Sequence, residues 1–114
     1  MKHLSFADKS LFLDDESADL LLEYAGLLAS ERSGDTVTVR AVGPDGNEVD
    51  ATFVLNSATN LIAESTNSDL QPPSNPEAAD YMRQRIELLR NPPSVTPEEN
   101  AGELSSDAAF GDQI

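Results

Sequence analysis

The chain of 114 residues carries 21 Asp or Glu and 7 Lys or Arg, so its formal net charge at pH 7 is −14. This length suits one domain and leaves no room for a Rossmann unit with a substrate domain or for a (β/α)₈ barrel. Zero cysteine excludes a disulfide framework and a thiol nucleophile, and the single histidine, His3, excludes a His-rich zinc site.

The N-terminal segment predicts a short β-hairpin followed by a helix. Residues 2–6 alternate apolar and polar side chains, and residues 10–13 form a second apolar run after a short loop. Asp14 or Asp15 is placed to cap a helix that runs to about residue 31 or 32, with Glu16 in its first turn. Gly34 is expected to end this segment.

The helix shows two neighbouring apolar stripes, which together make a wide face suited to lying on a sheet. The stripes are formed by Leu21, Ala25 and Leu28 and by Leu20, Tyr24 and Leu27.

The middle of the chain predicts a second hairpin. Residues 36–42 and 48–55 alternate, with inward positions at Val37, Val39, Ala41, Val49, Ala51, Phe53 and Leu55. Residues 43–47 form the turn, in which Pro44 presets φ and Gly46 permits a left-handed backbone.

The last third of the body predicts one strand and one helix. Residues 56–59 form a turn before a strand at 61–66, and residues 69–75 form a loop. Asn75 is expected to cap the final helix, with Pro76 at its first position. The apolar spacing of Ala79, Met82, Ile86 and Leu89 indicates one buried face of a helix that ends near residue 90.

These elements predict an α+β domain over residues 1–90, in the order ββαβββα, with both helices on one face of a small antiparallel sheet. The other face is expected to stay open to solvent, with Thr36, Thr38, Arg40, Glu48, Asp50, Thr52 and Val54 on it. Residues 91–114 contain five acids and no base, and their scattered apolar residues predict a disordered acidic tail.

The sequence offers little that would support catalysis or a cofactor. His3 lies two residues from the start, where a general base is poorly held. Residues 45–50 miss the spacing of a calcium loop, and no phosphate-binding glycine loop is present, so we predict no enzyme activity, no metal and no cofactor. The arginines of the final helix predict a solvated face, with Arg83 four residues from Glu87 and able to pair with it.

The charge favours a non-enzymatic protein that binds a basic protein partner, in the way that small immunity proteins and antitoxins neutralise a cationic enzyme. The candidate binding residues form the densest acidic cluster: Asp14, Asp15, Glu16, Asp19 and Glu23. The same charge disfavours direct nucleic-acid or membrane binding.

Two alternatives to this function remain open. One is a DNA-mimic inhibitor of a DNA-binding protein. The other is a homo-oligomeric structural or regulatory domain, with a homodimer pairing through the strand near residues 61–66. The sequence shows no secretory signal and no membrane-spanning run, so we expect a cytoplasmic protein.

Overall fold

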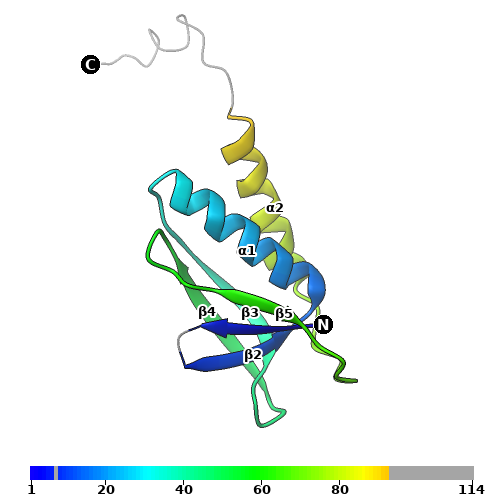
Figure 1. Cartoon of the computed structure of the whole chain (residues 1–114). Helices are drawn as coiled ribbons and strands as arrows, with labels where there is room; N and C mark the ends of the chain where they lie inside the picture. The colour runs from blue at the N-terminus through cyan, green and yellow to red at the C-terminus, as the bar shows by residue number, and fades with distance from the viewer. Residues whose placement is uncertain (7, 93–114) are drawn as a thin grey trace, which may run out of the picture.

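A computed structural model describes residues 1–6 and 8–92 of the chain (Figure 1). The elements are β1 (Lys2–Phe6), β2 (Lys9–Leu13), α1 (Asp15–Ser30), β3 (Asp35–Val42), β4 (Glu48–Leu55), β5 (Ile62–Ser65) and α2 (Pro76–Arg90). The predicted order ββαβββα is confirmed. Most of the predicted acidic tail, from residue 93 to residue 114, lies outside the described residues.

The five strands form one antiparallel sheet in the order β4-β3-β2-β1-β5. The β3–β4 ladder is long and unbroken, from Asp35 opposite Leu55 to Val42 opposite Glu48. By contrast, β2 and β3 share one residue pair, Phe12 with Val42. Both helices lie on the same side of this twisted sheet, as predicted, and α2 packs beside α1 (Figure 1).

The core lies between the helices and the covered face of the sheet. Strand residues that alternate toward the helices are buried, including Leu4, Leu13, Val37, Val39 and Leu55, and they meet the apolar side of each helix. The predicted stripes of α1 contribute Leu21, Tyr24 and Leu28 to this core, and α2 contributes Ala79, Met82 and Ile86. The predicted inward position Val49 is the exception, because it remains 36% exposed where neither helix covers the sheet.

The helix α1 ends at Ser30, close to the predicted end at residue 31 or 32, but the residue that terminates it differs from the prediction. The left-handed residue is Arg32, with a φ of 54°, and not Gly34. The Ser33 N–H donates to the Leu28 carbonyl at 2.9 Å and the Arg32 N–H to the Ala29 carbonyl at 3.2 Å, which is the hydrogen-bond pattern of a Schellman motif. Glycine is favoured at position 34 for a different reason, because a Cβ there would lie only 3.2 Å from the Leu55 carbonyl oxygen.

Candidate functional site

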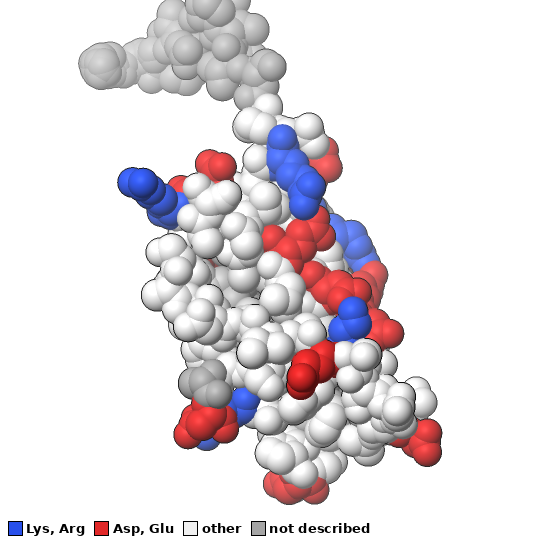
Figure 2. Space-filling model, viewed as in Figure 1, with Lys and Arg blue, Asp and Glu red and all other residues white. Residues whose placement is uncertain are grey.

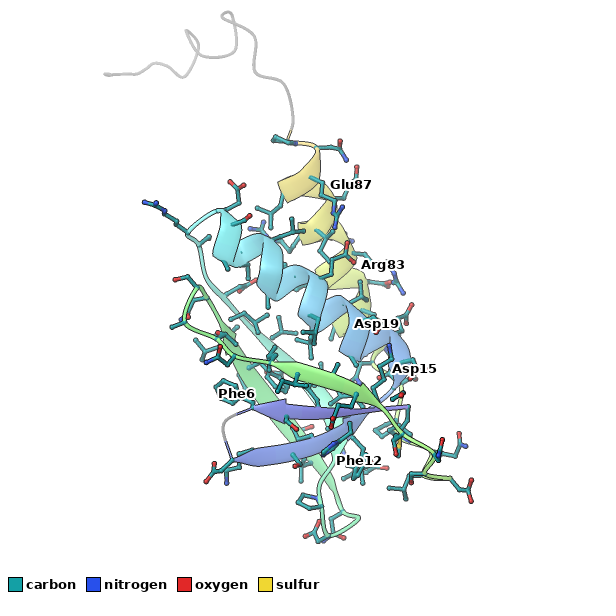
Figure 3. All side chains as sticks on the ribbon, in the orientation of Figure 1. Phe6, Phe12, Asp15, Asp19, Arg83 and Glu87 are labelled. Atoms are coloured by element: carbon teal, nitrogen blue, oxygen red, sulfur yellow. The ribbon has the colours of Figure 1, made fainter. Side chains whose placement is uncertain are left out.

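The five candidate acids lie together on the N-terminal half of α1 and at its cap, and we call them the α1 acidic ridge (Asp14, Asp15, Glu16, Asp19 and Glu23). Figure 3 shows Asp15 and Asp19 on the first turns of α1, near the N-terminal strand. Asp15 accepts from the N-terminal amine at 2.9 Å, and Asp19 accepts from Lys2 Nζ at 2.5 Å. These contacts lower the pKa of Asp15, mainly through the hydrogen bond from the amine, and raise the pKa of Lys2, mainly through its bond to Asp19.

The other side of the ridge faces α2. Glu16 forms an ion pair with Arg83, and Glu23 accepts from Arg90 Nη2 at 2.6 Å. Arg83 also reaches Asp80 at 2.8 Å, whereas Glu87 accepts from the Asn91 amide. The predicted pair of Arg83 with Glu87 is therefore wrong, because α1 lies close enough to α2 to offer Glu16 to that guanidinium.

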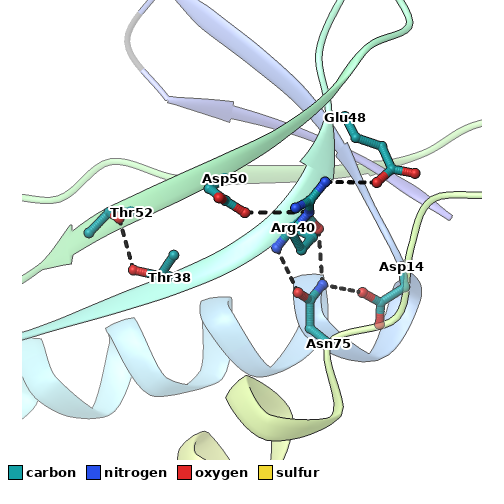
Figure 4. Close-up of polar contacts among 7 residues, drawn as sticks. All are labelled: Asp14, Thr38, Arg40, Glu48, Asp50, Thr52 and Asn75. Carbon is teal, nitrogen blue, oxygen red and sulfur yellow. Dashed lines mark hydrogen bonds and ion pairs between the residues drawn. The ribbon is translucent and has the colours of Figure 1, made fainter.

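Asp14 takes part in a more buried arrangement (Figure 4), the Asn75 junction (Asp14, Arg40 and Asn75). One Asp14 carboxylate oxygen caps α1 by accepting from the Ser17 N–H at 3.0 Å, and the other accepts from Asn75 Nδ2 at 3.0 Å. The same Asn75 amide donates to the Arg40 carbonyl at 3.0 Å, and its oxygen accepts from the Arg40 N–H at 2.6 Å. The Asn75 side chain therefore forms with Arg40 the two backbone hydrogen bonds that a neighbouring strand would form. It does so where β2 no longer runs beside β3, because the chain has already entered α1.

The position of Asn75 was predicted, but its role was not. It occupies the residue before α2, yet within the described residues its side chain makes no capping bond to that helix. The amide can satisfy one backbone N–H and one carbonyl at the same time, which a strand edge requires and a helix start does not. The sequence gives no signal for this contact, since Arg40 lies 35 residues away.

A second polar contact joins three elements through one carboxylate, and we call it the Asp35 cluster (Tyr24, Asp35 and Tyr81). The hydroxyls of Tyr24 on α1 and Tyr81 on α2 both donate to Asp35 Oδ2 at the start of β3, the latter at 2.5 Å. The two rings meet edge to face, with centroids 6.4 Å apart. The apolar stripe of the helix predicts the burial of Tyr24, but no local pattern in the sequence points to Asp35 or Tyr81 as its partners.

Hydrogen bonding and burial shift the pKa values of this cluster. Burial raises the pKa of Asp35, but the bonds from Tyr24, Tyr81 and the Thr36 N–H outweigh it, so the net pKa of Asp35 is lowered. The pKa of the Tyr24 hydroxyl is raised, first by burial and then by its bond to Asp35. The two hydroxyls on one carboxylate therefore join α1 and α2 to the start of β3.

The residues predicted on the open face of the sheet are exposed there, and several of them form polar pairs. Arg40 contacts Glu48 at 2.9 Å and Asp50 at 3.4 Å, and the hydroxyls of Thr38 and Thr52 lie 2.8 Å apart (Figure 4). On the other half of this face, His3 Nδ1 lies 3.2 Å from Glu64 Oε1, and its ring centroid is 5.2 Å from that of Phe12.

Neither a metal-binding cluster nor a membrane-spanning helix is present among the described residues. No group of three or more His, Cys, Asp or Glu in residues 1–6 and 8–92 is arranged to hold a metal ion. The hollow between β3 and the start of α2, of about 340 Å³, is lined by Thr38, Arg40, Asp50, Ser74 and Glu77 among others. No helix in this part of the chain is long and apolar enough to cross a membrane.

After internal pairing, the surface remains strongly negative. The chain through residue 92 has 16 acids and 7 bases, and several acids have no cationic partner within the described residues: Asp8, Asp14, Glu31, Asp35, Asp45, Asp69, Glu77 and Glu87. Figure 2 shows blue and red side chains interleaved along the helices and red groups alone at the lower tip, where the β3–β4 turn lies.

Comparison with known proteins gave no likeness, since no family model, no curated protein and no solved structure matches this chain.

Proposed function

We propose that this protein is a non-enzymatic binding protein that holds a basic protein partner on the α1 acidic ridge. The observation that carries the proposal is the exposure of the ridge carboxylates in spite of their internal partners. The side chains of Asp15, Glu16 and Asp19 are 62%, 55% and 61% exposed. Exposed ion pairs contribute little to stability, so a partner's lysines and arginines can replace the internal cations at small cost.

The rest of the molecule supports the same partner chemistry. A body with nine more acids than bases attracts a cationic protein over a distance set by the ionic strength, which speeds association. The ridge stands on a helix that is packed into the core through Leu21, Tyr24 and Leu28, so its carboxylates are held on a rigid element. The proposal includes residence in the cytoplasm, to which a chain without cysteine is suited.

The test is a pair of variants that remove the same amount of charge from different places. The ridge variant is D15N/E16Q/D19N/E23Q, and the control variant is D8N/E31Q/D69N/E87Q, whose acids have no cationic partner in the described residues. Asp14 is left intact, because it caps α1 and bonds Asn75. Each full-length protein is immobilised and exposed to host lysate at low salt, and the bound proteins are eluted by a salt gradient.

We expect one basic protein to elute from the native chain and from the control variant, and to be absent from the ridge variant. Equal loss from both variants would show that net charge alone retains the partner. Equal retention by all three would overturn the assignment of the ridge. Purified partner is then titrated at two ionic strengths, and the affinity is expected to fall as salt rises.

A further inference from the structure

Strand β4 is an outer strand of the sheet, and its free edge is long. All eight of its residues pair with β3 on one side, in continuous register and without a bulge. On its other side, no strand among the described residues pairs with it. β5, the opposite outer strand, has only four residues.

The parity of the ladder shows which backbone groups of β4 face outward. The N–H and carbonyl of Arg40 bond to Asn75, on the side of β3 away from β4, so Arg40 and its partner Asp50 form a non-hydrogen-bonded pair. By alternation, Glu48, Asp50, Thr52 and Val54 direct their backbone groups away from β3. The bond from Thr59 Oγ1 to the Val54 carbonyl at 2.9 Å confirms this direction for Val54.

Apart from the bond of Thr59 to the Val54 carbonyl, this edge has few of the usual protections against strand pairing. Natural edges are shielded by lysine, proline, bulges or covering segments, and β4 has no lysine, proline or glycine. Its two acids are partly neutralised by Arg40 of the adjacent strand. It also leaves apolar surface uncovered on both faces, since Val49 is 36% exposed and Val54 is 59% exposed.

We propose that β4 is a self-association edge, which pairs antiparallel with β4 of a second copy about a two-fold axis at Ala51. In this register, Asp50 faces Thr52 of the other copy and Glu48 faces Val54. The outward backbone groups then exchange hydrogen bonds, and the small Ala51 side chains meet at the close, non-hydrogen-bonded position. Val49 faces Phe53 of the other copy on the side of the helices.

The neighbouring symmetric registers are less favourable. Centring the pair on Asp50 would place this acid opposite its own copy, which is a like-charge contact in a cross-strand pair. Centring it on Thr52 would place Glu48 opposite Asn56, beyond the end of the strand, and would leave only three outward residues of β4 paired, whereas the Ala51 register pairs all four. The Ala51 register keeps Asp50 and Thr52 fully bonded to each other and separates the acids.

Self-association and capture of a basic partner respond to salt in opposite ways. Two copies that each carry −14 repel, so added salt is expected to tighten the dimer, whereas it weakens binding to a cationic protein. Sedimentation equilibrium of the full chain from about 1 µM to about 500 µM, at low and high salt, measures this directly. A monomer at every concentration and both salts would overturn the proposal.

Variants at Thr52 test the edge and the register without disturbing the core. Thr52→Pro removes an N–H that does not face β3, a position at which edge strands tolerate proline, and should abolish the dimer. Thr52→Glu places an acid opposite Asp50 of the other copy and should raise the dimer dissociation constant roughly tenfold, whereas Thr52→Lys should lower it by a similar factor. The same charges at Thr36, which is on the same face but on β3, are the matched control and should change the constant little.

A single cysteine locates the axis, because the chain has no cysteine of its own. Ala51→Cys is expected to form an intermolecular disulfide under mild oxidation, since facing residues of a non-hydrogen-bonded pair lie within reach of one. Ile62→Cys on β5, which is 60% exposed, reports on the opposite edge. Cross-linking through Ile62 and not through Ala51, or a dimer indifferent to Thr52→Pro, would overturn the assignment to β4.

Discussion

The two sides of α2 hold the molecule together by polar contacts of very different kinds. Toward the sheet, Asn75 and Tyr81 bond to β3 through a side-chain amide and a hydroxyl. Toward α1, Arg83 and Arg90 form ion pairs with Glu16 and Glu23. On the sheet side Asn75 is only 9% exposed although Tyr81 is 41% exposed, and on the α1 side the Arg83 and Arg90 side chains are 46% and 53% exposed.

The difference matters because the sheet is weakly joined at its centre. Strands β2 and β3 share a single residue pair, so the β3–β4 hairpin has few backbone bonds to the other three strands. The Asn75 junction links β3 to the helices at Arg40, two residues from that pair, and the Asp35 cluster links the opposite end of β3 to both helices. We therefore expect the sheet side of α2 to carry most of the polar stabilisation and the α1 side to remain available for a partner.

The largest effect is expected from Asn75→Ala. The substitution removes three hydrogen bonds and leaves the Arg40 N–H and carbonyl without their partner, so it should lower the free energy of unfolding by about 2–4 kcal/mol. Urea denaturation followed by circular dichroism measures the change. Asn91→Ala, at an exposed asparagine that bonds only Glu87 among the described side chains, is the matched control and should cost about 0.5 kcal/mol or less. Equal losses of unfolding free energy in the two variants would show that the buried contacts of Asn75 stabilise the fold no more than an exposed hydrogen bond does.

Asp35→Asn should have the next largest effect, and the effect depends on pH. The folded-state pKa of Asp35 is lowered below its ordinary value of 3.8, so its stabilisation is present above that value and is lost as the pH falls through the folded-state pKa. At about pH 6 the variant should be less stable by about 1–2 kcal/mol, because hydrogen bonds to a charged acceptor are the stronger ones. The urea midpoints of the native chain and the variant, measured from pH 6 downward, should converge in acid. A difference between the two midpoints that does not change with pH would contradict a stabilising charge on Asp35.

Local patterns in the sequence predict the elements, and contacts between distant residues decide the polar links. The alternation of residues 36–42 and 48–55 and the turn at Gly46 predict the β3–β4 hairpin, which is confirmed. The end of α1 at Ser30 lies within two residues of the predicted end, but the left-handed residue is Arg32, and Gly34 instead allows a close approach to Leu55. No local signal joins Asn75 to Arg40, or Tyr81 to Asp35 across 46 residues.

In the candidate site, too, the sequence predicts the residues but not their partners. The density of acids between residues 14 and 23 is evident in the sequence, and the ridge on α1 follows from helical spacing. The cations that form ion pairs with those acids come from the N-terminus, from β1 and from α2. Which cation pairs with which acid depends on how these elements pack. Arg83 illustrates the point, since a local pair with Glu87 was predicted and Glu16 across the helix interface is the partner.

Tyr24→Phe tests the Asp35 cluster from the alkaline side. The pKa of Tyr24 is raised by burial and by Asp35, so its stabilisation is fully present below the ordinary tyrosine value of 10.0 and is lost as the pH rises above it. At about pH 8 the variant should lose about 1 kcal/mol, which corresponds to one hydrogen bond. Above pH 10 the native chain should lose stability more steeply than the variant. Urea midpoints of both proteins from pH 8 to pH 11 measure how steeply each loses stability. Parallel curves of midpoint against pH would contradict the hydrogen bond between Tyr24 and Asp35.

The smallest effect is expected on the α1 side of α2. Arg83→Gln and Glu16→Gln should each change the free energy of unfolding by about 0.5 kcal/mol or less, because both side chains are about half exposed and the pair is screened by salt. A double-mutant cycle in urea, at low and at high salt, isolates the energy of the pair. A coupling above about 1 kcal/mol that persists at high salt would show that the ion pair is a structural link. A small, salt-sensitive coupling leaves Glu16 free to exchange Arg83 for a cation on another protein, which is the property that a binding ridge requires.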